Sequence, residues 1–177
     1  PDEIMSYCAP SKASAKKIFW RRIKSFIPNE ALLGKPNETE LYLDLSNGVR
    51  IQLDGSDNAD AVRGLTFRGG VLEEADYMPN DFYDTVYEPN LKPTKGPCLF
   101  ISSPQGNWFS KRWKRARAGS LGRDWAAFHY TIYDNPHISR EEIEETKKNT
   151  PDDIWRREYM AEDDACSGIQ YNEFNDS

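Results

Sequence analysis

GGVLEEAD, at residues 69–76, is a short apolar run that ends in two adjacent acidic residues, Glu73 and Glu74. Such a run is typical of a buried strand in a parallel sheet. The carboxyl ends of parallel strands form the edge at which open α/β sheets bind ligands. We therefore expect both acids to reach one cleft, one to hold a metal ion and the other to position water. The alternative is a solvated strand end.

A second apolar run, residues 98–101, ends in the hydroxyl side chains of Ser102 and Ser103, followed by Pro104. A helical pattern between the two runs, at residues 79–91, predicts the parallel strand–helix–strand unit. Neighbouring strands that end in acids and in hydroxyls match the nucleotide side of a P-loop ATPase. There the acids organise magnesium and water, and the polar strand end senses the γ-phosphate.

The composition indicates a globular protein. The chain has 177 residues, of which 38% are hydrophobic and 12% aromatic, enough for one domain with a core. No apolar run approaches the roughly 20 residues that span a bilayer, and no signal-peptide pattern opens the chain. We therefore expect a soluble, intracellular protein. The net charge of −6 argues weakly against a nucleic-acid binder that uses its whole surface.

Two groups of residues stand out from this average composition. Residues 111–117 contain five basic side chains, Lys111, Arg112, Lys114, Arg115 and Arg117. The three cysteines are widely spaced, which suits neither a disulfide framework nor a zinc site. We expect Cys8 and Cys98 to be buried strand residues.

The remaining patterns predict an α/β order of elements. A helix that begins at Ser11 and runs to about Phe26 should turn a stripe of apolar side chains inward. Asn47-Gly48 is typical of a tight hairpin turn. The expected elements are a strand at 4–9, hairpin strands at 40–45 and 49–53, a helical turn at 56–62, a helix at 107–118, a strand at 126–132, and helices at 139–148 and 151–160. The inward stripe is Ala15, Ile18, Phe19, Ile23 and Phe26.

The order of these signals resembles the ATPase domain of the tailed-phage DNA-packaging terminase large subunit, in its part after the phosphate loop. The matching pieces are Ala9-Pro10, Ser46-Asn47-Gly48, Gly55 to Asn58, Val62-Arg63-Gly64, Val71 to Ala75, Ile101 to Asn107 and Gly168 to Phe174. The resemblance implies a three-layer P-loop ATPase fold of the additional-strand type, mostly parallel with a β-hairpin and lacking the phosphate-loop strand. It implies that residues 1–164 are part of the motor domain and residues 165–177 a linker toward an absent nuclease domain.

This chain departs from the family pattern in three ways. Glu73 stands where the family usually has Asp. The sequence has no G-x-x-x-x-G-K-[ST] phosphate loop, and it stops before the nuclease carboxylates. We therefore expect a fragment that starts just after the phosphate loop and that is inactive toward ATP by itself.

The resemblance assigns a role to each candidate residue. Glu74 would be the catalytic carboxylate that orients water, and Glu73 would hold magnesium. Arg63 would reach the nucleotide of a neighbouring subunit; the alternative is a structural ion pair. Ser102 and Ser103 would relay the nucleotide state; the alternative is a Ser-Ser-Pro turn that ends the strand. The basic cluster would contact DNA phosphates; the alternative is a solvated helix face.

The implied function is that of a motor subunit that hydrolyses ATP with Mg²⁺ and moves double-stranded viral DNA into a procapsid. The implied partners are the viral DNA, the portal, the small terminase subunit and further copies in a ring, without a membrane. The implied location is the cytoplasm of the infected bacterial host, transiently at the procapsid portal. Two alternatives are a non-hydrolysing DNA-binding or assembly module and a fragment of a helicase-type ATPase.

Overall fold

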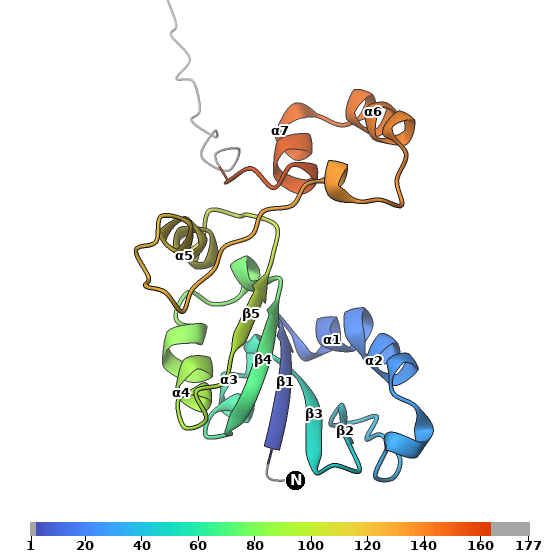
Figure 1. The fold of residues 1–177 in the computed structure, drawn as a ribbon, viewed down its shortest axis with the longest axis vertical. Helices are drawn as coiled ribbons and strands as arrows, with labels where there is room; N and C mark the ends of the chain where they lie inside the picture. Colours follow the sequence, from blue (N-terminus) through green and yellow to red (C-terminus); the bar gives the residue numbers. More distant parts are fainter. Residues whose placement is uncertain (1–2, 164–177) are drawn as a thin grey trace, which may run out of the picture. The chain divides into compact units, whose positions relative to one another are not determined.

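The computed structural model describes residues 3–163, which belong to two compact units, Pro1–Ser102 and Ser103–Ser177. The first unit contains a five-stranded sheet in the order β2-β3-β1-β4-β5 (Figure 1). Only β2 is antiparallel to its neighbour. The strands are β1 (Glu3–Ala9), β2 (Tyr42–Asp44), β3 (Val49–Gly55), β4 (Phe67–Glu73) and β5 (Cys98–Ile101).

Helical segments cover both faces of this sheet, which makes three layers (Figure 1). Phe82, Val86 and Leu91 are buried toward the sheet, as the sequence predicts. The expected fold class, a mostly parallel P-loop-like sheet with a β-hairpin, is confirmed. One face carries α1 (Lys12–Ala15), η1 (Lys16–Trp20) and α2 (Arg21–Phe26); the other carries α3 (Ala59–Val62), η5 (Tyr83–Tyr87) and α4 (Glu88–Leu91).

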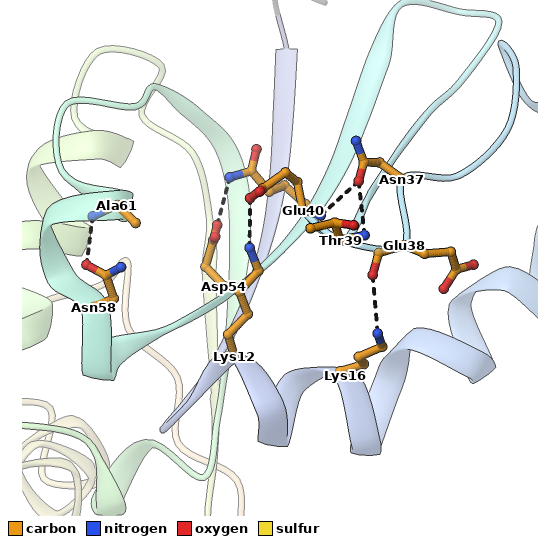
Figure 2. Close-up of polar contacts among 10 residues, drawn as sticks. Lys12, Lys16, Asn37, Glu38, Thr39, Glu40, Asp54, Asn58 and Ala61 are labelled. Atoms are coloured by element: carbon orange, nitrogen blue, oxygen red, sulfur yellow. Dashed lines mark hydrogen bonds and ion pairs between the residues drawn. The ribbon is translucent and has the colours of Figure 1, made fainter.

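The hairpin of β2 and β3 turns at Asn47 and Gly48, as predicted. Gly48 has a φ of +89°, and the Asn47 side chain accepts a hydrogen bond from the Val49 amide. Two polar contacts join the loop before β2 to the first helical segments, α1 and η1 (Figure 2). Lys12 forms an ion pair of 2.9 Å with Glu40, and the Lys16 ammonium group donates to the main-chain carbonyl of Glu38 at 3.2 Å.

The predicted inward stripe of the first helix is wrong at its end. Phe26 is 72% exposed, whereas Trp20, which the stripe omits, is 3% exposed and lies in the core. The cause is the π-helical turn η1, which holds an extra residue between α1 and α2. A helix with this turn no longer follows the period of 3.6 residues, so the inward face changes along its length.

The strand predicted at residues 126–132 is absent from the second unit. A strand needs a neighbouring strand to accept its hydrogen bonds, and within residues 3–163 this segment has none. The predicted helices are confirmed, and Ser139 and Glu142 form the expected capping box. The elements of this unit are α5 (Trp108–Arg117), η6 (Ile132–Asp134), α6 (Arg140–Asn149), α7 (Asp152–Ile154) and η7 (Trp155–Tyr159).

Three smaller expectations have different outcomes. Cys8 is buried as predicted, whereas Cys98, expected to be buried, is only half-buried because β5 is an edge strand of the described sheet. Cys166 and the linker expected at residues 165–177 lie outside the described residues. Within residues 3–163, no helix has both the length and the apolar character that crossing a bilayer requires.

Candidate active site

Glu73 and Glu74 lie where β4 ends. Glu73 is the last residue of the strand, and Glu74 takes a left-handed conformation, with φ of +53° and ψ of +46°, before the turn η4 (Ala75–Tyr77). This conformation costs a non-glycine residue roughly 1–2 kcal/mol. Backbone strain of this kind is concentrated at functional sites. Side chains alternate between the two faces of the sheet only as far as Glu73. The left-handed turn at Glu74 then gives its side chain a different direction from the one that strand geometry would set.

Ser102 follows β5 and meets the acidic end of β4. Its hydroxyl donates a long hydrogen bond of 3.4 Å to Glu74 Oε2 and accepts one of 3.2 Å from the Asp76 amide. The predicted meeting of an acidic strand end with a hydroxyl strand end is therefore present. Ser103 begins the second unit, so its predicted role stays a prediction.

The surroundings of Glu73 favour its protonated form more than water does. Burial, and secondly the charge of Glu74, raise the pKa of the half-buried Glu73 carboxyl group. A hydrogen bond with Tyr7 and the charge of Arg22 act in the opposite direction, but they are weaker. Tyr7 is a residue that sequence reasoning missed; the signal was its place on a strand that lies beside β4 in the sheet.

The donor set suits magnesium only together with further ligands. Within residues 3–163, no group of three or more His, Cys, Asp or Glu side chains could hold a metal ion. Magnesium is commonly bound through one or two carboxylates, with water and substrate phosphates completing the shell. The two carboxylates beside the Ser102 hydroxyl fit that pattern, because all three side chains offer hard oxygen ligands.

Arg63 is not brought together with this site. It follows α3, and its polar contacts are an ion pair of 3.6 Å with Asp60 and a hydrogen bond of 3.5 Å to the Thr85 carbonyl. Its side chain is 57% exposed. Both contacts are long for charge-assisted bonds, so they leave the guanidinium group accessible to a ligand.

The basic cluster lies on α5, and its five members have different surroundings. Arg112 lies over the rings of Trp108 and Trp125, and Arg117 lies over Trp113. Lys114 pairs with Asp163 at 2.5 Å. The other two, Lys111 and Arg115, are exposed and stand one helical turn apart, so they share one side of α5.

Two sequence relatives are large terminase subunits of phages. The chain is 27% identical over 179 residues to the terminase large subunit of Escherichia phage T5, covering 99% of this chain and 40% of that protein. It is 31% identical over 120 residues to the terminase large subunit of Thermus phage G20c, covering 60% of this chain and 25% of that protein. The chain therefore spans less than half the length of these relatives.

Solved structures show the same fold at low sequence identity. The ATPase domain of the Thermus phage P74-26 large terminase matches with a TM-score of 0.72 and 24% identity, over 92% of this chain and 77% of that domain. The large terminase from a thermophilic bacteriophage, in complex with ADP, matches with a TM-score of 0.74 and 14% identity, over 91% of this chain and 40% of that one.

The family model described as terminase large subunit, T4likevirus-type, N-terminal matches residues 3–174, nearly the whole chain. The elements within the matched range include the acid-tipped strand β4, the hairpin and the hydroxyl-tipped strand β5. The chain belongs to this terminase large subunit family.

Proposed function

We propose that this chain is part of an ATP-hydrolysing motor that moves double-stranded viral DNA into a procapsid. The observation that carries the proposal is the meeting of Glu73, Glu74 and Ser102 at adjacent strand ends, with Ser102 bonded to Glu74. Membership of the terminase large subunit family supports it. The activity belongs to the full-length protein, because the chain covers only part of its relatives.

In this proposal the two acids divide the chemistry between them. Glu74 accepts a hydrogen bond from the attacking water and orients it toward the γ-phosphate. Glu73 holds Mg²⁺ through its water shell. The bound Mg²⁺ would neutralise charge on the phosphates as the terminal group leaves. Ser102, and Ser103 after it, would report the nucleotide state to the rest of the chain, since the Ser102 hydroxyl contacts Glu74 directly.

The proposed nucleotide is ATP. A large terminase with the same fold has been solved with ADP and also with ATP-γ-S, which supports an adenine nucleotide as the ligand. Arg63 would contact the nucleotide of a neighbouring subunit in a ring. The further partners are the portal and the small terminase subunit, in the cytoplasm of the infected host and transiently at the procapsid.

Replacement of Glu73 tests this division of roles. In the full-length protein, Glu73→Ala should raise the Mg²⁺ concentration that gives half-maximal ATPase activity by about tenfold or more, the effect of losing one charged ligand contact. Glu73→Asp should stay close to the parent because it keeps the carboxylate. A steady-state ATPase assay against Mg²⁺ concentration measures both. Glu30→Ala, an exposed acid outside the site, is the control, and an Asp variant as impaired as the Ala variant would contradict the assignment.

We propose a DNA contact for the exposed pair Lys111 and Arg115 on α5. The double variant Lys111→Gln/Arg115→Gln should bind DNA more weakly at every sequence and should reduce the slope of log affinity against log salt by about two. Fluorescence anisotropy across a salt series measures this slope. Lys147→Gln/Lys148→Gln removes the same charge from α6 and should leave the slope unchanged; equal slopes for all three proteins would favour the solvated-face interpretation.

A further inference from the structure

Tyr7 on β1 and Glu73 on β4 lie on the same face of the sheet. Tyr7 is the register partner of Val71 in the parallel pair of β1 and β4. Glu73 follows Val71 by two residues, so strand alternation places its side chain on the same face, about 6.6 Å further along the sheet. Tyr7, Val71 and Glu73 all line an open pocket of about 550 Å³ within the first unit.

The ring of Tyr7 is held firmly. It stacks on Phe19 of η1, with 4.4 Å between ring centroids and 15° between ring planes, and the residue is only 5% exposed. The hydroxyl group is therefore fixed in one place by packing of the ring. A buried tyrosine hydroxyl group usually has a hydrogen-bond partner.

The hydroxyl group of Tyr7 departs from this pattern. It is buried, and within residues 3–163 it has no hydrogen-bond partner of regular geometry. A buried hydroxyl group without a partner is costly. Burial, and secondly the charge and hydrogen bonding of the Glu73 carboxylate, raise the pKa of the Tyr7 hydroxyl group, so Glu73 is the acceptor that acts on it. Arg22 lines the same pocket, and its charge lowers the pKa of both groups.

We propose that Tyr7 is a positioning residue for Glu73, whose hydroxyl group holds one carboxylate oxygen so that the other is directed to the metal shell. The inference rests on the proposed role of Glu73 in holding magnesium. A glutamate has three side-chain torsions, and fixing them costs conformational entropy. A rigid donor beside the carboxylate reduces that cost at the moment of metal binding, which is a form of preorganisation.

Tyr7→Phe is the direct test, because it removes the hydroxyl group and keeps the ring that stacks on Phe19. In the full-length protein we expect the Mg²⁺ requirement of ATP hydrolysis to rise about three- to tenfold, with kcat at saturating Mg²⁺ nearly unchanged. The affinity of the protein–ATP complex for Mn²⁺, measured by electron paramagnetic resonance without turnover, should fall by the same factor. Unchanged metal affinity in both measurements would overturn the proposal.

A double variant tests whether Tyr7 affects metal binding through Glu73 or through a general change in the structure. In Glu73→Ala no carboxylate remains for the Tyr7 hydroxyl group to hold, so adding Tyr7→Phe to Glu73→Ala should cause no further loss of Mn²⁺ affinity. If Tyr7→Phe costs the same factor in both backgrounds, the residue does not act through Glu73 and the proposal is wrong.

Tyr87→Phe is the matched control. It removes another buried tyrosine hydroxyl group, one that lies 3.5 Å from the main-chain carbonyl of Ser6 and belongs to η5 on the other face of the sheet. It should lower the denaturant midpoint and leave metal affinity unchanged. If Glu73→Ala itself left metal dependence unchanged, the proposed function of Glu73 would fail and this inference with it. If Glu73→Ala has its expected effect and Tyr7→Phe has none, only the positioning role fails.

Discussion

Full-length protein carrying Glu74→Gln should bind ATP as tightly as the parent and hydrolyse it about a thousandfold more slowly. Glutamine has nearly the shape of glutamate, so it can keep the left-handed turn and the contact with Ser102. What it loses is the negative charge that orients water and accepts its proton, a contribution of about 10²- to 10⁴-fold. Steady-state turnover and equilibrium ATP binding, measured side by side, separate the two effects.

The control for this variant is Glu30→Gln, an amide exchange at an exposed acid outside the site. It should leave turnover unchanged. Near-normal hydrolysis by Glu74→Gln would remove Glu74 from the catalytic role. Loss of ATP binding together with hydrolysis would instead indicate that Glu74 acts on the fold of the strand end.

Arg63→Ala should reduce ATP hydrolysis by about a thousandfold in assembled rings, the scale seen when an arginine that stabilises the transferring phosphoryl group is removed. The reason is that its guanidinium group is more than half exposed and, among the described residues, has only long polar contacts, none of them with the acids of that subunit's site. This placement leaves the guanidinium group available to a nucleotide held by another subunit, as the proposed function requires.

Mixed assemblies give the decisive measurement for Arg63. Subunits with Arg63→Ala, mixed with subunits that carry Glu74→Gln, should recover part of the activity that each variant lacks alone, because some interfaces then pair an intact arginine with an intact acid. Arg68→Ala, which removes an arginine that pairs with Glu3, is the control and should be active without mixing. Failure of every mixture, despite demonstrated assembly, would favour a structural role for Arg63.

The sequence predicted the features that depend on neighbouring residues in the chain. The hairpin turn at Asn47 and Gly48, the capping box at Ser139 and the acid-tipped strand β4 follow from local chemistry, and all three are present. The meeting of Glu74 with Ser102 was also predictable, because consecutive strands joined by a helix are usually neighbours in a parallel sheet.

The features that sequence reasoning missed depend on contacts between distant segments. The burial of Phe26 was predicted wrongly because no local sequence signal indicates the π-helical turn η1. Residues 126–132 have the composition of a strand, yet a strand exists only beside a partner. The role of Tyr7 could not be predicted, because it depends on the register between β1 and β4. That register cannot be read from the sequence.

The position of β1 in the sheet has a consequence for how the protein is made. β1 lies between β3 and β4, yet it precedes both in the chain. Ribosomes add about 5–20 residues per second, and β4 follows β1 by about 60 residues, so several seconds pass before both neighbours exist. Until β3 is made, both edges of β1 lack their partner strands, and until β4 is made one edge still does. Among the described strands, β1 is therefore made first and waits longest for its two neighbours.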